Sequence, residues 1–131
     1  MADLATLVGR ILIALLFLGG GVQKISDPEP ARALLAMRGL PEALLWPALA
    51  FNLAAGLALI LGWRTGPVAA LLAAYCAVTS WFHWQPEDPW QITIFVKNWA
   101  IAGGCLVLAA HGAGRFALDA RRQRGQGARA S

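Results

Sequence analysis

Charged residues are scarce in this 131-residue chain: they make up 14% of the sequence, against 58% hydrophobic residues, and the mean hydropathy is +0.56. A globular domain is usually nearer half apolar and about a quarter charged, so this apolar excess does not fit in one water-surrounded core. The composition excludes an intrinsically disordered chain, and the length excludes a two-domain enzyme. It favours a membrane protein.

Cysteine and histidine are also rare, at two residues each. The absence of a CxxC motif argues against thiol exchange of the thioredoxin type. Cys76 and Cys105 are expected at depths that differ by about 9 Å, so no disulfide is expected between them. His83 and His111 are expected on opposite faces of a membrane, which argues against a haem held by two histidines, and we predict no metal site. Walker, dinucleotide-binding and GxSxG motifs are absent as well.

Long apolar runs, in contrast, are abundant. A helix crosses the roughly 30 Å hydrocarbon layer in about 19 residues, at about 1.5 Å per residue. Runs of that length occur at residues 4–22, 44–63, 65–82 and 92–110. They predict an all-α fold, an integral membrane four-helix bundle, with residues 1–114 as a single transmembrane domain.

The segments outside these runs fit such a bundle. The first loop, residues 23–43, is bracketed by prolines and has room for a short interfacial helix over residues 31–38. After Gly114 the sequence turns polar and rich in small residues. Residues 115–131 are therefore predicted to form a basic, flexible tail.

Arginines are concentrated on one side of the predicted bundle. With four spans, the N-terminus, the turn at residues 62–67 and the tail share one face, which carries Arg64, Arg115, Arg121, Arg122, Arg124 and Arg129. The opposite face carries Lys24, Arg32 and Arg38. The positive-inside rule therefore predicts that both termini are cytoplasmic. The net charge of +4 comes mainly from the arginines of this tail. A basic tail beside an apolar span favours the lipid bilayer over nucleic acid as a partner.

Polar side chains inside a membrane are costly, so each one calls for a partner or a function. All four predicted helices place such side chains in the outer third of the bundle, among them Lys24, Asn52, His83, Lys97 and Asn98. Facing inward, they would form a basic pocket open to the outside. Lys97 is its strongest element, because a buried amine can donate to a carbonyl or bind an anion. Trp81 and Trp99 would pack against the ring of a ligand bound in this pocket.

Each of these residues also has a purely structural interpretation. Lys97 can extend its amine outward to water. Asn52 and Asn98 can form interhelical hydrogen bonds that only hold the bundle together. His83 fits an ordinary interfacial position beside tryptophans, and Trp99 faces either lipid or the bundle.

Arg10 is the single charge in the first span and lies about 9 Å inside the face that carries the termini. At that depth its guanidinium can reach the phosphates of the cytoplasmic leaflet. Alternatively, it can pair with Asp119, which besides Asp3 is the one acid on that face. The sequence leaves both arrangements open.

Four local features share one order along the chain: GRILIALLFLGGGVQKISDP from Gly9, FNLAAGLALILGWRTGPVAALLAAY from Phe51, His83, and FVKNWAIAGGCLVLAAHGAGRFALD from Phe95. Together they resemble the DoxX family of small four-helix membrane proteins, from Gly9 to Asp119. The resemblance implies a bundle in the bacterial inner (plasma) membrane that is associated with redox work. Members of the family include a subunit of a thiosulfate:quinone oxidoreductase.

The family pattern falls on Arg10, Gly21, Lys24, Gly56, Gly62, His83, Lys97, Asn98, Gly114, Arg115, Leu118 and Asp119. One position departs from it, because Asn52 stands where many relatives have a glutamate. If that glutamate carries protons or pairs with Lys97 in relatives, this chain has lost the role or performs it differently.

The first hypothesis is a component of a membrane redox system that binds a quinone-like or small oxygen-bearing ligand. Its candidate catalytic residues are Lys97 and His83, and its candidate ligand-binding residues are Lys24, Asn52, Asn98, Trp81 and Trp99. No cofactor is expected to be bound covalently, and a partner redox subunit or a second copy of the chain would complete the system. The second hypothesis is a non-catalytic scaffold or accessory subunit, and a third, weaker one is a small-solute permease.

Overall fold

The computed structural model describes the backbone of residues 1–130 and the side chains of residues 1–128. Its elements are α1 (Ala2–Ser26), α2 (Glu29–Met37), η1 (Glu42–Leu44), α3 (Leu45–Leu61), α4 (Thr65–Ser80), η2 (Trp81–His83), α5 (Pro89–His111) and α6 (Leu118–Ala130). This range contains no strand, so the all-α prediction is confirmed. Ser131 and the side chain of Arg129, one of the tail arginines, lie outside the described part.

Four helical segments are long and apolar enough to cross a membrane: Ala2–Ser26, Glu42–Leu61, Thr65–His83 and Pro89–His111. Their number agrees with the four predicted spans, and the helix ends differ from the ends of the predicted spans by a few residues. At α1 the helix continues past residue 22 to Ser26, because Gln23 and Lys24 are good helix formers although they are not apolar. It ends before Pro28, which disfavours helical backbone in the residue that precedes it.

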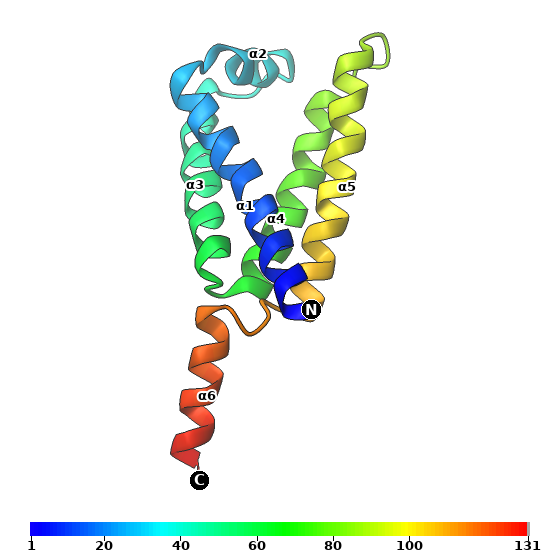
Figure 1. Cartoon of the computed structure of the whole chain (residues 1–131). Helices are drawn as coiled ribbons and strands as arrows, with labels where there is room; N and C mark the ends of the chain where they lie inside the picture. Colours follow the sequence, from blue (N-terminus) through cyan, green and yellow to red (C-terminus); the bar gives the residue numbers. More distant parts are fainter. Residues whose placement is uncertain (131) are drawn as a thin grey trace.

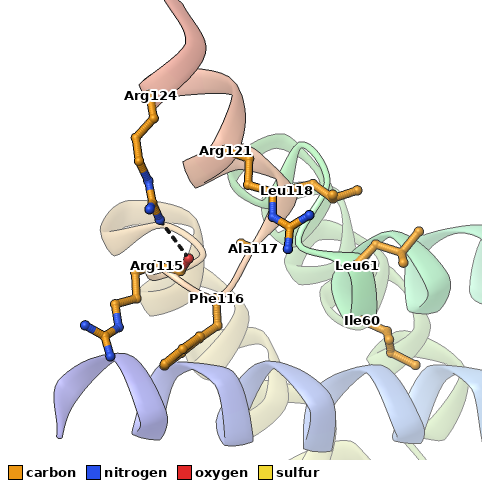
Figure 2. A pocket seen from close by; sticks show the side chains of 8 residues that line it. All are labelled: Ile60, Leu61, Arg115, Phe116, Ala117, Leu118, Arg121 and Arg124. Carbon is orange, nitrogen blue, oxygen red and sulfur yellow. Dashed lines mark hydrogen bonds between the residues drawn. The ribbon is translucent and has the colours of Figure 1, made fainter. Parts of the chain in front are cut away.

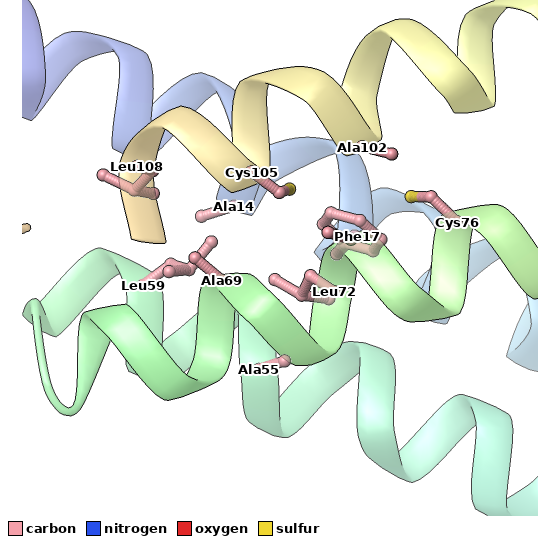
Figure 3. Close-up of a cluster of buried hydrophobic side chains, with 11 residues drawn as sticks. Ala14, Phe17, Ala55, Leu59, Ala69, Leu72, Cys76, Ala102, Cys105 and Leu108 are labelled. Carbon is pink, nitrogen blue, oxygen red and sulfur yellow. The ribbon is translucent and has the colours of Figure 1, made fainter. Parts of the chain in front are cut away.

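The bundle consists of two helix pairs: α1 packs mainly on α3, and α4 packs mainly on α5. The pairs lie closest at the end that carries the N-terminus and diverge towards the end that carries α2 (Figure 1). Side chains from all four helices meet in the core, including Ala14, Leu59, Leu72 and Cys105, each 0% exposed (Figure 3). The other cysteine, Cys76, is buried in the same cluster, and both thiols are free.

Two glycines allow α1 and α3 to approach closely. A Cβ atom on Gly56 would lie 2.7 Å from Leu18 Cγ, and one on Gly21 would lie 2.6 Å from Leu53 Cδ2. Real Cβ atoms do not approach neighbouring carbons this closely, so a larger residue at either position would push the helices apart. Small residues at such contacts are typical of helix packing in membranes.

Helix α2 lies across the end of the bundle opposite the N-terminus (Figure 1) and confirms the short helix predicted in the first loop. Arg38, directly after α2, fastens it to η2. Its Nη2 donates to the carbonyl oxygens of Trp81 at 2.6 Å and Trp84 at 3.2 Å, and its guanidinium lies 4.6 Å from the centre of the Trp81 ring. The first loop is therefore attached to the α4/α5 pair.

The N-terminus and the start of α6 lie at the same end of the bundle, and α6 then runs away from it (Figure 1). Residues 115–131 were predicted to be a flexible tail, and the structure places most of them in α6. The mobility of this segment and the side of the membrane on which it lies remain predictions.

Candidate functional site

Three polar side chains meet inside the spanning part of the bundle, one each from α1, α3 and α4. Asn52 is 3% exposed. In the amide orientation that pairs every donor with an acceptor, its Oδ1 accepts from Lys24 Nζ at 3.1 Å, and its Nδ2 donates to the Tyr75 hydroxyl and the Ala48 carbonyl, both at 3.2 Å. Lys24 Nζ also donates to the carbonyl of Gly20 at 3.3 Å. We call Lys24, Asn52 and Tyr75 the polar cluster.

Aromatic rings from two other helices enclose the tyrosine of the polar cluster. The ring centre of Tyr75 lies 6.3 Å from that of Phe17 on α1 and 5.2 Å from that of Phe51 on α3. Sequence reasoning missed Tyr75, although it is the chain's single tyrosine and its hydroxyl falls within a span. That combination was the signal that could have identified it.

Lys97, the strongest of the predicted pocket residues, does not lie in the polar cluster. Its side chain is exposed on α5, and its Nζ lies 5.7 Å from the centre of the Trp90 ring. Trp99 is 51% exposed and contacts Phe95 edge to face, with ring centres 6.4 Å apart. Both side chains thus lie on the outside of the bundle, as in the structural interpretation of Lys97.

The remaining predicted residues form local contacts of their own. Asn98 Nδ2 donates to Thr79 Oγ1 at 3.4 Å, which joins α5 to α4. His83 Nδ1 lies 2.7 Å from Gln91 Oε1, across the turn between η2 and α5. Trp81 is 50% exposed, with Arg38 over its ring.

The structure therefore brings together Lys24 and Asn52 and adds Tyr75, whereas Lys97, His83 and Asn98 occupy separate positions. Among the described residues, no hydrogen bond or ion pair joins these three to the polar cluster. The cluster offers an ammonium, an amide and a phenol, and no carboxylate. Such a set can donate hydrogen bonds to a carbonyl or an anion. Residues 1–130 contain no group of three His, Cys, Asp or Glu side chains placed to hold a metal ion.

Arg10 adopts neither of the two predicted arrangements. It is 1% exposed, so it does not extend towards lipid phosphates. Its guanidinium instead donates to backbone carbonyls: Nη1 to Ala113 at 2.7 Å and Nη2 to Phe116 at 2.7 Å. A buried guanidinium needs acceptors, and the loop between α5 and α6 supplies them within reach. In the described part of the chain, Arg10 forms no ion pair with Asp119.

The carboxylate of Asp119, a residue of α6, instead caps the first turn of α4. Its Oδ1 accepts from the backbone N–H of Arg64 and its Oδ2 from that of Thr65, both at 2.8 Å, where the first N–H groups of a helix lack intrahelical partners. Partial burial raises the pKa of Asp119, but these two hydrogen bonds and the charge of Arg122 outweigh it, so the pKa lies below its ordinary value. A residue distant in sequence thus caps this helix.

The chain is similar to one protein family and to two named bacterial proteins. Residues 5–84 match the sequence model of a family described as DoxX. The inner membrane protein YqjF of Escherichia coli (strain K12) is 30% identical over 120 residues, which cover 91% of this chain and 92% of that protein. The inner membrane protein YphA of the same organism is 32% identical over 124 residues, 88% of each chain. No solved structure matches the chain significantly.

The matched range includes all three residues of the polar cluster and ends just after His83, before Lys97 and the C-terminal loop. The relatives cover nearly the full length, and both are named as inner membrane proteins. Four membrane-length helices in this chain agree with that location. The chain therefore belongs to the DoxX family and is a multi-pass protein of the bacterial inner membrane.

Proposed function

We propose that the protein is a component of a membrane redox system that binds the polar head of a quinone-like ligand at Lys24, Asn52 and Tyr75. The observation that carries this proposal is the convergence of an amine, an amide and a phenol from α1, α3 and α4, where Asn52 is buried and Lys24 and Tyr75 are half-buried. Burying such groups is costly, and three of them from three helices at one point favour a binding role. Lys24, and not Lys97, is the lysine of this binding site, because the side chain of Lys97 is exposed on α5.

The chain's own part in the reaction is binding and proton delivery. Lys24 Nζ and the Tyr75 hydroxyl are donors, so each can hydrogen-bond to a carbonyl oxygen of the ligand. Reduction of a quinone to a quinol consumes two electrons and two protons. The electrons come from a partner redox subunit in this proposal, while Lys24 and Tyr75 lie where a proton can be passed to the reduced oxygen.

The test is a titration of the purified protein with decylubiquinone in detergent. We expect Lys24→Met to weaken binding by about tenfold or more, since a hydrogen bond to a charged group contributes roughly 1.5–3 kcal/mol. Lys97→Met is the matched control, because it removes the same charge from the exposed face of α5 and should change the affinity less than about twofold. Equal losses in both variants, or none in Lys24→Met, would rule out this site.

A second candidate function is a non-catalytic accessory subunit, in which the polar cluster only sets the register of the helices. The specific observation in its favour is that the contacts within the cluster already pair Asn52 with both other side chains. On this account Lys24→Met and Tyr75→Phe lower the melting temperature in detergent and leave any quinone affinity unchanged. On the first account both variants weaken quinone binding at a temperature where they remain folded.

A further inference from the structure

An open groove of about 670 Å³ lies at the terminal end of the bundle, where α3 ends and α6 begins. Its lining combines three arginines with apolar side chains: Arg115, Arg121, Arg124, Ile60, Leu61 and Phe116 (Figure 2). Figure 2 shows the Arg121 side chain extending beside Leu118 towards Leu61, with Arg124 and Arg115 on the other side of the loop. Guanidinium groups and a hydrocarbon surface thus border the same space.

The charge of this groove is unbalanced. No Asp or Glu contributes to its lining. Arg115 lies 3.8 Å from Asp3, but within residues 1–128 neither Arg121 nor Arg124 lies within ion-pair distance of a carboxylate. Arg124 Nη2 donates to the backbone carbonyl of Arg115 at 3.4 Å. Several guanidinium groups without a matching acid favour an anionic ligand, and phosphate suits their paired N–H groups best.

The apolar side of the groove is continuous with the surface of the membrane-spanning helices. Ile60 and Leu61 are the last two residues of α3, and Leu61 is 56% exposed. Phe116 is 46% exposed and has the Arg115 guanidinium 4.7 Å from its ring centre. The end of a membrane span is the level at which lipid headgroups meet acyl chains. A free phosphate ion would use the arginines and leave this apolar side uncovered.

We propose that the groove binds an anionic phospholipid. The arginines that line the groove bind its phosphate, and the upper part of its acyl chains covers Ile60, Leu61 and Phe116. The groove lies at the opposite end of the bundle from α2 and does not involve the polar cluster. The proposal is therefore independent of the proposed redox function.

The experiment titrates dioleoyl phosphatidylglycerol into the detergent-solubilised full-length protein and counts bound lipids by native mass spectrometry. The double variant Arg121→Ala/Arg124→Ala should weaken binding about 30-fold, since each arginine near an anionic lipid contributes roughly fivefold in affinity. Arg122→Ala is the matched control: it removes the same charge from the same helix, but Arg122 does not line the groove and acts on Asp119. It should change affinity less than about twofold.

Two further arms separate the possible ligands. Dioleoyl phosphatidylcholine should bind at least about tenfold more weakly, because its headgroup carries no net charge. Inorganic phosphate at equal concentration should not displace the lipid. A third variant, Leu118→Glu, adds an acid to the groove and keeps every arginine, so it should also weaken binding.

The proposal is overturned if Arg122→Ala weakens binding as much as the double variant, since the attraction would then be diffuse. It is also overturned if phosphatidylcholine binds equally well, or if inorganic phosphate competes at equal concentration. Melting temperatures of all variants, measured in the same detergent, exclude loss of fold as the cause of lost binding. A variant that melts early is replaced in the comparison by Leu118→Glu.

Discussion

Arg10 of α1 donates through Nη2 to the carbonyl oxygen of Phe116 at 2.7 Å, so a residue near the start of the chain holds a loop that lies 106 positions further along. A second bond, from Nη1 to the carbonyl of Ala113, fastens the start of the same loop. The guanidinium therefore replaces the water that this loop would need for its carbonyls. This arrangement connects the first span to the segment that leads into α6.

Replacing this guanidinium should lower the free energy of unfolding considerably. We expect Arg10→Met to cost about 3 kcal/mol, because it removes the hydrogen bonds of a charged donor to the carbonyls of Ala113 and Phe116 and a longer one, at 3.5 Å, to that of Ile60. The measurement is thermal or denaturant unfolding in detergent. Arg32→Ala is the control: its pair with Glu29 on α2 is exposed and should contribute less than about 1 kcal/mol. A loss for Arg10→Met no larger than that of the control would contradict the structural role of Arg10.

Gly62, at the end of α3, should tolerate alanine poorly for two separate reasons. Its φ of 66° is in the left-handed region, and a Cβ there would lie 2.4 Å from Ala117 Cβ and 2.7 Å from Arg10 Nη1. Gly39 has the same φ of 66° but nothing within 4 Å of its Cβ position, so it isolates the backbone effect.

We expect Gly39→Ala to cost about 1 kcal/mol from backbone strain, and Gly62→Ala about 3 kcal/mol because overpacking is added. Both values come from unfolding measurements in the same detergent. Equal losses would mean that the loop after α5 moves away from Gly62 without cost, contrary to the close packing seen here.

Asp119 should make the stability depend on pH in the acid range. Its pKa in the folded protein lies below the ordinary value of 3.8, so its contribution is complete above that value and is lost as the pH falls through the folded pKa. We expect Asp119→Asn to cost about 1 kcal/mol at pH 7, as for loss of a helix cap, and the difference from the wild type to shrink below about pH 4. The measurement is the unfolding free energy of both proteins from pH 7 to pH 3.

The control for this pH dependence is Glu87→Gln. Glu87 is an exposed carboxylate in the turn before α5 and caps no helix. Its replacement should change the free energy of unfolding at pH 7 by less than about 0.5 kcal/mol. A gap between Asp119→Asn and the wild type that stays constant down to pH 3 would show that the carboxylate's charge is not what stabilises the start of α4.

Asn52 should be more sensitive to an apolar replacement than Asn98. Asn52→Leu leaves Lys24 and the Tyr75 hydroxyl without their shared partner inside the bundle, which we expect to cost about 2 kcal/mol. Asn98 is only half-buried and has one longer hydrogen bond, so Asn98→Leu should cost less than about 1 kcal/mol. Melting curves of the two variants side by side test this order. The reverse order would mean that the α4/α5 contact, and not the polar cluster, determines the register.

The orientation inferred from the arginines is directly measurable. The N-terminus and the start of α6 lie at one end of the bundle, and we expect that end to face the cytoplasm. A green fluorescent protein fused after residue 131 should then be fluorescent, whereas alkaline phosphatase fused at the same point should be inactive. Active phosphatase would invert the orientation.

Much of the fold could be predicted from local sequence. The four spans follow from hydropathy and length, because a helix must satisfy its own backbone hydrogen bonds in lipid. The short helix of the first loop followed from the spacing of its prolines. Helix α1 continues to Ser26, beyond the apolar run that ends at residue 22, because hydropathy does not register polar residues that continue a helix, such as Gln23 and Lys24.

The candidate site was only partly predictable. Depth along each span placed Lys24, Asn52, Lys97 and Asn98 in the outer third of the bundle, but depth does not tell which way a side chain faces. That direction depends on the rotation of each helix about its axis, which packing against neighbouring helices determines. Lys24 and Asn52 therefore meet, while Lys97 points away from the core and lies by Trp90.

The sequence by itself thus determined that this chain is a four-span helical membrane protein, because apolar run length and the distribution of arginines are local properties. Only the tertiary structure decided that Tyr75 joins Lys24 and Asn52, that Arg10 holds the loop before α6, and that Asp119 caps α4. These contacts join residues distant in the chain. They depend on how helices rotate and approach one another, which no local pattern encodes.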